Sequence, residues 1–249
     1  LFANKFCKSV LMRAPMSQYL PAVRARTQVV RRSFLRPCQL RIDRRHIIPE
    51  KQGAVGLGIA GLADRAGTLC YSPNLPDLLG FPIGPELEDA IGVPVTVGND
   101  ATTATLGEAR LGAGRGSDHF GLVTLGTGIG TGFVLDGRLV EGAHGFAGEA
   151  GHMVVDANGP AHITGHRGPW EYFASGSALG RMGRMAAGEG RFGRGLVLAG
   201  AVDEVTGQHV AEALDEGDSD AASIFDGFCR EVARGVASLV LVLDLERIV

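Results

Sequence analysis

The sequence predicts an α/β fold, and three observations lead to that prediction. Thirty-eight glycines punctuate short apolar runs in a chain of 249 residues without forming a repeat, which is typical of a turn-rich α/β enzyme. A β-favouring run at 94–97 ends in polar residues and leads into a helical stretch at 101–110, the order in which α/β proteins place ligand-binding groups. A long helical pattern at 222–244 precedes a short strand at 245–249. The length allows one large or two modest domains.

The elements at the start of this pattern are short and interrupted by turns. Residues 54–64 have the pattern of a buried strand that ends in a glycine-rich loop. The stretch 68–82 is extended and punctuated by prolines, and it carries Asn74. Residues 84–92 are expected to form a short amphipathic helix, because Pro85 stands in its first turn, acidic residues follow, and a glycine ends the pattern.

Asp100 is the first candidate for chemistry. The strand at 94–97 delivers Asn99 and Asp100 to its carboxyl end. A carboxylate in this place can act as a general base. It can also be a helix N-cap, since Asp and Asn routinely precede a helix such as the one at 101–110. From these residues alone, the capping role is the simpler interpretation.

A glycine-lined hairpin is the most distinctive feature of the chain. A β-favouring run at 122–125 leads into glycines at every second position, and a second apolar run follows at 133–135. Alternate glycines clear one backbone face for an anion such as phosphate, although a tight turn with nothing bound is the alternative. The spacing is not G-x-G-x-x-G, because Thr131 stands at the third glycine, and no P-loop motif occurs. The glycines are Gly126, Gly128, Gly130 and Gly132.

Charge is distributed unevenly along the chain. Residues 1–50 carry eleven lysines and arginines against two acids, although the whole chain has a net charge of −3. The remainder is therefore acidic, and we expect no nucleic-acid partner, because binding phosphates requires a clustered basic face. The basic segment fits a transit peptide, a basic arm or a non-native leader. We expect an atypical leader, disordered or foreign to the fold.

Cysteine spacing and hydropathy indicate the compartment. The four cysteines are widely separated and form no C-x-x-C motif, so we expect no disulfide framework and a cytoplasmic protein. The longest apolar run, at 236–243, is far shorter than the roughly 20 residues of a membrane-spanning helix, and no membrane partner is expected. The cysteines are Cys7, Cys38, Cys70 and Cys229.

Five motifs occur in a fixed order along the chain. They are SPNLP at 72–76, VGND at 97–100, LGTGIGTG at 125–132, GEAGH at 148–152 and WEYFASGSALG at 170–180. Together they resemble the ROK family of sugar kinases and sugar-responsive repressors, and within it the bacterial glucokinases. The resemblance extends from about Ala54 to Val249. Each motif alone is weak, whereas the ordered set is highly specific.

The resemblance implies an actin-like, ribonuclease-H-like sugar kinase fold of two domains with the active site between them. Residues 51–110 would be the remainder of a small α/β domain, and residues 111–249 a larger sugar- and nucleotide-binding domain. Family members open with a D-x-G-G-T-K-like phosphate loop, which has no counterpart in residues 1–53, and they continue beyond the strand at 245–249. We therefore expect an incomplete small domain and truncation at both ends.

The resemblance also implies a role for each candidate residue. Asp100 would be the base that accepts a proton as the 6-hydroxyl of glucose attacks the γ-phosphoryl group of ATP, with Mg²⁺ accompanying the nucleotide. The implied contacts to the ATP phosphates are Gly126, Thr127, Gly128 and Gly130. Carboxylates, amides and imidazoles suit sugar hydroxyls, whose hydrogen bonds have fixed directions. The implied sugar ligands are Asn74, Asn99, Asp100, Glu149, His152 and Glu171.

Three of these residues also have ordinary structural interpretations. Glu149 could be a solvated charge, His152 a packed histidine, and Glu171 an acid in the first turn of a helix. The family pattern favours the functional interpretation for all three.

A structural zinc is expected to be absent. The family binds zinc through the histidine of GEAGH and the three cysteines of C-x-C-G-x-x-G-C, and the matching positions here are His162, Thr164 and Pro169. Threonine is a poor zinc ligand, and proline has no side-chain donor. A rearranged site is the alternative, built from His152, His162 and His166.

The principal hypothesis is therefore an ATP-dependent hexose kinase acting on glucose. The alternatives are a ROK-type regulator that binds sugar without turnover, or an inactive remnant that keeps the sugar pocket. Kinases of N-acetylated amino sugars or fructose, and polyphosphate as the donor, stay open. A homodimer is expected from the resemblance alone.

Overall fold

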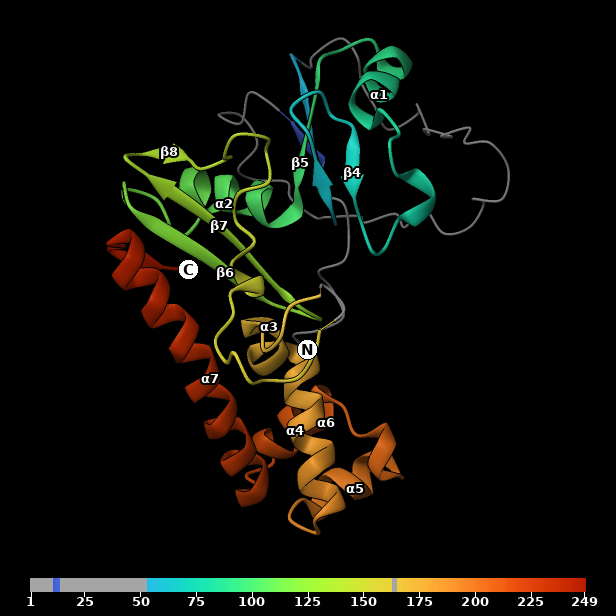
Figure 1. The fold of residues 1–249 in the computed structure, drawn as a ribbon, viewed down its shortest axis with the longest axis vertical. Coiled ribbons are helices and arrows are strands. Elements are labelled where there is room, and N and C mark those ends of the chain that lie inside the picture. Colours follow the sequence, from blue (N-terminus) through green and yellow to red (C-terminus); the bar gives the residue numbers. More distant parts are fainter. Residues whose placement is uncertain (1–10, 14–52, 163–164) are drawn as a thin grey trace. The chain divides into compact units, whose positions relative to one another are not determined.

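The computed structural model describes residues 11–13, 53–162 and 165–249 (Figure 1). Apart from Leu11–Arg13, the predicted leader at 1–50 lies outside the described residues. Also outside them are Cys7, Cys38 and Thr164.

The described residues form two compact units. The larger unit contains Ala104–Val140 and Ala147–Val249. The smaller unit contains the described residues as far as Thr103, together with Glu141–Phe146. The predicted domain division after residue 110 stays a prediction.

A three-stranded sheet with the order β1–β2–β5 forms the centre of the smaller unit. Strand β2 (Val55–Ile59) lies antiparallel to β1 (Leu11–Arg13) and parallel to β5 (Val95–Asn99). A hairpin of β3 (Leu62–Ala63) and β4 (Leu69–Tyr71) follows β2. Strand β2 confirms the buried strand that the sequence predicts within residues 54–64. The buried core residues of the unit are Ile59, Ala63, Leu69 and Ile83.

Two helices follow the predicted boundaries closely. Helix α1 (Ile83–Ile91) ends at Gly92, which has the left-handed φ of 74° and donates its N–H to the Glu88 carbonyl. Helix α2 (Asp100–Leu111) begins directly at the end of β5. The strand-to-helix junction that the sequence predicts is therefore confirmed.

The larger unit is built on the glycine hairpin. Strands β6 (Phe120–Leu125) and β7 (Ile129–Leu135) pair antiparallel, as predicted. Strand β8 (Arg138–Leu139) extends the sheet beside β7, and β9 (Arg247–Ile248) lies parallel to β6 on the other side. The C-terminal strand predicted at 245–249 thus completes this sheet.

Helices α3 to α7 belong to the same unit. The helices are α3 (Trp170–Ala174), α4 (Gly176–Gly188), α5 (Gly193–Ala199), α6 (Gly207–Asp215) and α7 (Ser219–Leu243). The short 3-10 turns of the chain are η4 (Pro76–Leu78), η5 (Ala150–His152) and η6 (Val202–Glu204). Helix α7 begins with the Asp218 carboxylate accepting the N–H of Ala221 at 2.7 Å, and it confirms the long helix predicted at 222–244. None of the helices in the described ranges is long and apolar enough to cross a membrane.

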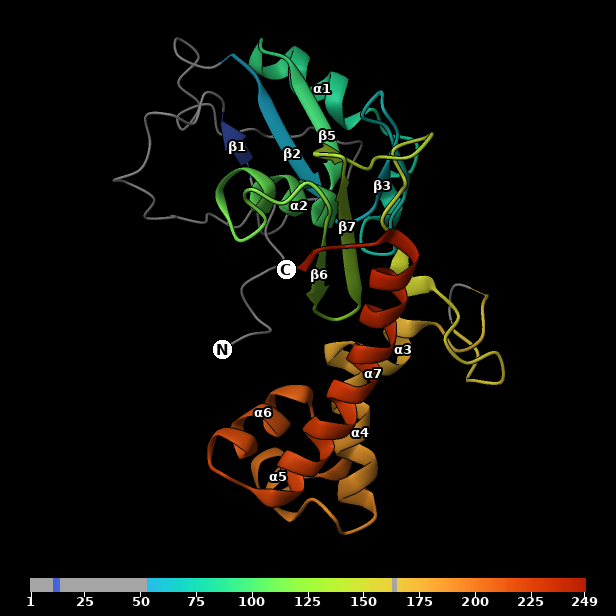
Figure 2. The same ribbon diagram turned by 90° about the vertical axis from the view of Figure 1, so that its left-hand side faces the viewer.

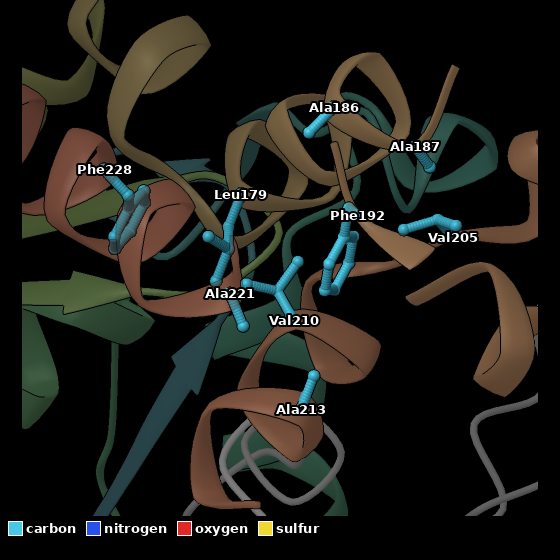
Figure 3. Close-up of a cluster of buried hydrophobic side chains, with 9 residues drawn as sticks. All are labelled: Leu179, Ala186, Ala187, Phe192, Val205, Val210, Ala213, Ala221 and Phe228. Atoms are coloured by element: carbon cyan, nitrogen blue, oxygen red, sulfur yellow. The ribbon is translucent and has the colours of Figure 1, made fainter. Parts of the chain in front are cut away.

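Helix α7 contributes to two hydrophobic cores along its length. Figure 2 shows the course of this helix beside α3 and α4. Its first half packs with α4 and α6 around a helical core. Its second half brings Leu239 into a cluster with Phe133 of β7 and Trp170 of α3. Figure 3 shows the side chains of the helical core, which are Leu179, Ala186, Ala187, Phe192, Val205, Val210, Ala213, Ala221 and Phe228.

Candidate functional site

The first candidate group lies in the smaller unit, at the carboxyl end of β5. Asn99 Oδ1 accepts hydrogen bonds from the backbone N–H groups of Ala101 at 2.8 Å and Thr102 at 3.2 Å. Its Nδ2 donates to the carbonyl of Gly61 at 3.2 Å. Asn99 therefore takes the capping role that the sequence analysis weighed for Asp100.

Asp100 begins α2, and its side chain reaches solvent. Its Oδ1 accepts the N–H of Ala101 at 2.9 Å. Desolvation by the surrounding atoms raises the pKa of Asp100, while hydrogen bonds from the N–H groups of Ala101 and Asp100 itself oppose the rise. An exposed carboxylate with a raised pKa is a stronger base than an ordinary aspartate, as acceptance of a substrate proton requires.

The segment that carries Asn74 is tied to the same end of the sheet. Ser72 is buried, and its hydroxyl donates to the Ala60 carbonyl at 2.7 Å and accepts the N–H of Asn74 at 3.2 Å. Ala60 precedes Gly61, which accepts the hydrogen bond from Asn99. The segment of Asn74 and the side chain of Asn99 are thus hydrogen-bonded to two adjacent residues, Ala60 and Gly61. Ser72, which the sequence analysis did not single out, holds this segment in place.

The predicted phosphate-binding stretch is divided between a turn and a strand in the larger unit. Gly130 lies within β7, opposite Thr124. Gly126, Thr127 and Gly128 form the turn, in which the Gly126 N–H donates to the Gly128 carbonyl at 3.0 Å. The turn, rather than the whole alternating pattern, is therefore the candidate for approach of an anion.

Two glycines and a threonine hold the GEAGH motif against β7. Gly148 has a φ of 102°, and a Cβ atom there would lie 2.6 Å from the Thr131 carbonyl oxygen. A Cβ atom at Gly151 would lie 2.6 Å from the carbonyl oxygen of Ile129. The buried Thr131 hydroxyl donates to the Gly148 carbonyl and accepts the N–H of Ala150 at 3.0 Å. These contacts fix the backbone that carries the glutamate and the histidine of the motif.

Thr131→Val is expected to destabilise the protein by about 1–3 kcal/mol, because it leaves the Gly148 carbonyl and the Ala150 N–H without their partner. Thermal unfolding measures this loss. Thr124→Val is the matched control, since Thr124 is exposed and its hydroxyl makes one hydrogen bond, to Gly130. Equal losses of stability in the two variants would contradict the anchoring role of Thr131. In the sequence, the only signal for this role is that a threonine interrupts the run of alternating glycines.

Glu171 is the centre of the second candidate group. It stands in the first turn of α3 with its side chain 16% exposed. Its Oε1 lies 3.5 Å from Nδ1 of His152 and 3.3 Å from Nε2 of His162, and its Oε2 accepts the N–H of Ile129 at 3.3 Å. Nε2 of His152 lies 3.5 Å from Glu149 Oε2. The structure therefore brings three predicted sugar ligands of the larger unit together and adds His162.

Gly128→Ala tests the predicted sugar contact of Glu171, and if this contact exists the sugar affinity is expected to fall about tenfold, or ~1.4 kcal/mol. A Cβ atom at Gly128 would lie 2.5 Å from Oε2 of Glu171, so the carboxylate must shift away from the Ile129 N–H. Gly126→Ala is the control on the same turn, because its Cβ meets nothing closer than 4.0 Å. Calorimetric titration with glucose compares the two variants, and equal affinities would show that the position of Glu171 does not matter.

The alternative metal site of three histidines has two of its members in one group of side chains. Among the described residues, one group of side chains has metal-ligating atoms within 4.8 Å of one another. The group is His152, His162 and Glu171. His166 is exposed and stands outside the group, although its carbonyl accepts the N–H of His162 at 2.9 Å. The cysteine-type zinc site does not fit, because Pro169 has no donor, and Thr164 lies outside the described residues.

Three comparisons with known proteins agree with one another. A family model described as the ROK family matches residues 40–249. The glucokinase of Thermotoga maritima is 39% identical over 203 residues, which cover 80% of this chain and 63% of that protein. The solved ROK family glucokinase from Streptomyces griseus, in complex with glucose and AMPPNP, has a TM-score of 0.70 and 36% identity, and the match covers 77% of this chain and 62% of that one.

A relative with a different function matches a shorter stretch. The xylose repressor of Bacillus subtilis is 36% identical over 129 residues, which cover 51% of this chain and 33% of the repressor. The chain thus spans less than two thirds of the length of each of these three proteins.

Proposed function

The chain belongs to the ROK family, and from this premise we propose that it is an ATP-dependent hexose kinase that phosphorylates the 6-hydroxyl of glucose. Its α/β fold is the actin-like fold of ROK sugar kinases, as the sequence predicted. Two findings support glucose as the substrate. One is the identity with a glucokinase, and the other is the similarity to a glucokinase structure that contains glucose and an ATP analogue.

Asp100 carries the proposal. Its exposed carboxylate stands at the strand-to-helix junction, and desolvation raises its pKa. Asn99, rather than Asp100, is the N-cap of α2. In the proposed reaction Asp100 accepts the proton of the sugar hydroxyl as that oxygen attacks the terminal phosphoryl group of ATP. A regulator that only binds sugar has no need of such a base.

The sugar-contacting residues fall into two sets. Asn74 and Asn99 belong to the smaller unit, and the amide of Asn99 keeps one N–H beyond its bond to Gly61. Glu149, His152 and Glu171 belong to the larger unit, where the imidazole lies within 3.5 Å of both carboxylates. Each set offers acceptors and donors with fixed directions, which is what discrimination among hexose hydroxyls requires.

The turn at Gly126, Thr127 and Gly128 is the proposed contact to the ATP phosphates, with Mg²⁺ accompanying the nucleotide as a further proposal. The Glu171 carboxylate lies against Gly128 on one side of this turn. Like charges repel, so the phosphates take the other side of the turn. This arrangement separates the anionic nucleotide from the sugar-binding carboxylate.

A coupled assay with ATP, Mg²⁺ and glucose tests the proposal directly. N-acetylmannosamine and fructose in place of glucose test the substrate, and polyphosphate in place of ATP tests the donor. Glucose-dependent formation of ADP supports the proposal. If no ADP forms at glucose concentrations that raise the melting temperature, the result contradicts the proposal.

The second candidate function is a sugar-sensing regulator without turnover. The identity with a xylose repressor over 129 residues favours it. In this case glucose or xylose stabilises the protein against thermal unfolding, and no phosphorylated sugar forms. The same two measurements therefore separate the two functions.

A further inference from the structure

We propose that Gly176 of α4 and Gly207 of α6 are positioning residues for the phosphoryl donor, because they hold the glycine turn at 126–128 in place. The inference rests on the proposed contact of this turn with the ATP phosphates. The turn and both helices belong to the larger unit. Neither glycine touches the donor; both act through the carbonyl of Gly126, at the start of the turn.

The backbone of the glycine turn leaves two N–H groups for a ligand. The Gly126 N–H donates to the Gly128 carbonyl at 3.0 Å. After the turn, the Ile129 N–H donates to Glu171. Within the described ranges, the N–H groups of Thr127 and Gly128 have no hydrogen-bond partner. These two are therefore the donors that phosphate oxygens would meet, and their directions depend on where the first carbonyl of the turn is held.

Helix α4 holds the carbonyl of Gly126. The first residue of the helix, Gly176, donates its N–H to that carbonyl at 2.7 Å. A Cβ atom at Gly176 would lie 2.7 Å from the same oxygen, so this close approach requires glycine. The buried N-cap of the helix, Ser175, accepts the N–H of Ala178 at 3.2 Å and fixes the first turn of α4. The start of α4 and the start of the glycine turn are therefore joined by backbone atoms.

Helix α6 supports Gly176 through its own first residue. A Cβ atom at Gly207 would lie 2.9 Å from the Gly176 carbonyl oxygen, whereas an ordinary Cβ contact begins at 3.4 Å. One turn further along α4, a Cβ atom at Gly180 would lie 3.1 Å from the nitrogen of Gly207. Arg184 of α4 donates to the carbonyl of Val205 at 2.6 Å, just before α6 begins. The N-terminus of α6 is therefore fixed on α4 at the end that meets the turn.

The two helices can transmit a displacement because they share a packed core. Leu179 of α4 and Val210 of α6 are both buried in the helical core. A close-packed interior is poorly compressible, so it passes on a shift rather than absorbing it. The carbonyl of Gly176 is thus the link through which a change at Gly207 reaches Gly126.

Nucleotide titration of the full chain is the first test. AMPPNP with Mg²⁺ is titrated in a calorimeter, and glucose is titrated separately. Gly207→Ala is expected to lower the AMPPNP affinity about tenfold, because a 1 Å misplacement costs about 100-fold and the new Cβ atom requires roughly half that shift. The glucose affinity should stay unchanged, because the Ile129 N–H keeps its bond to Glu171. In the coupled assay, the KM for ATP should rise and the KM for glucose should not.

Gly183→Ala is the matched control for a loss of packing alone. A Cβ atom at Gly183 of α4 would lie 2.8 Å from the side chain of Val210 and 3.0 Å from that of Val205. This variant disturbs the same helix pair away from the turn, so it should lower the melting temperature and leave the AMPPNP affinity unchanged. Gly180→Ala takes the place of Gly207→Ala if the latter does not fold, and we expect a smaller loss of AMPPNP affinity from its milder contact.

A double variant tests whether the two glycines act through one carbonyl. Gly176→Ala displaces the carbonyl of Gly126 directly, and it should lower the AMPPNP affinity at least as much as Gly207→Ala. Because both substitutions move the same turn, the loss in the double variant should be smaller than the product of the two single losses.

The possible failures are distinguishable. A folded parent chain that binds no AMPPNP overturns the proposed function together with this inference. If the parent binds AMPPNP and Gly207→Ala binds it equally well, only the inference is overturned. The same holds if Gly183→Ala and Gly207→Ala lose affinity equally, if the glucose affinity falls as much as the AMPPNP affinity, or if the losses of Gly176→Ala and Gly207→Ala multiply.

Discussion

Asp100→Asn is expected to lower kcat for glucose phosphorylation by about 10²- to 10⁴-fold, the usual contribution of a general base. Asparagine keeps the size and the hydrogen-bond acceptor of the side chain, but it cannot take up a proton. The coupled assay measures kcat, and calorimetric titration with glucose measures binding separately. We expect the sugar affinity to fall much less than kcat, because other residues share the proposed sugar contacts.

The pH profile of the proposed activity in the parent protein provides an independent check of the same residue. Asp100 acts as a base only when it is ionised, and its pKa is raised above the ordinary value of 3.8. The acid limb of kcat/KM should therefore fall at a higher pH than an ordinary aspartate would give, since this ratio reports the free enzyme. An acid limb at or below 3.8 would show that Asp100 does not control it.

The stability of Asp100→Asn should change in the opposite direction from its activity. The folded state disfavours the ionised carboxylate, so it binds more protons than the unfolded state between 3.8 and the raised pKa. The free energy of unfolding therefore falls as pH rises through this window, and the cost is complete above it. The variant lacks this cost, and its melting temperature should exceed that of the parent at pH 7, with the difference shrinking toward pH 3.8.

A variant that loses both activity and stability at neutral pH would point to a structural role for Asp100. Asn99→Ala provides the comparison, because it removes the cap of α2. We expect it to destabilise the protein by about 1 kcal/mol. The stabilities of the two variants thus distinguish the cost of the ionised Asp100 carboxylate from the contribution of the Asn99 cap.

Local signals in the sequence predicted most of the elements around the candidate site. The alternating glycines placed the β6–β7 hairpin, and Gly92 placed the end of α1. The strand-to-helix junction at Asp100 followed from a β-favouring run and a helical run with two polar residues, Asn99 and Asp100, between them. Each of these signals acts over a few residues, which is why a single sequence reveals it.

Contacts between distant residues could not be predicted in the same way. The Ile129 N–H meets Glu171 across 42 residues, and the Thr131 hydroxyl meets Gly148 across 17. Neither partner carries a local signal for the other. The grouping of Glu171 rather than His166 with His152 and His162 could not be predicted for this reason, because spacing along the chain does not show which side chains converge. Helices α5 and α6 were not predicted, although their core is apolar.

Gly235→Ala is expected to destabilise the protein by about 1–3 kcal/mol or more, because overpacking forces a core to shift. Trp170 of α3 is fully buried, and its Nε1 donates to the Glu231 carbonyl of α7 at 3.0 Å. A Cβ atom at Gly235 would overlap the indole ring. Gly235 is thus required by the close approach of α3 and α7. Denaturant unfolding monitored by tryptophan fluorescence measures the effect.

Gly227 of the same helix gives the matched control. A Cβ atom there meets nothing within 4 Å, so Gly227→Ala should stabilise the protein by about 0.5–1 kcal/mol through helix propensity alone. Trp170→Ala should cost about 3–5 kcal/mol, the range for loss of a buried aromatic side chain. In the double variant of Trp170 and Gly235 to alanine, the penalty at Gly235 should disappear, because the clashing ring is gone. If the losses of the two single variants add in the double variant, the penalty at Gly235 does not come from the clash with the indole ring. The contact of this ring with α7 would then not be what holds α3, and the Glu171 on it, in place.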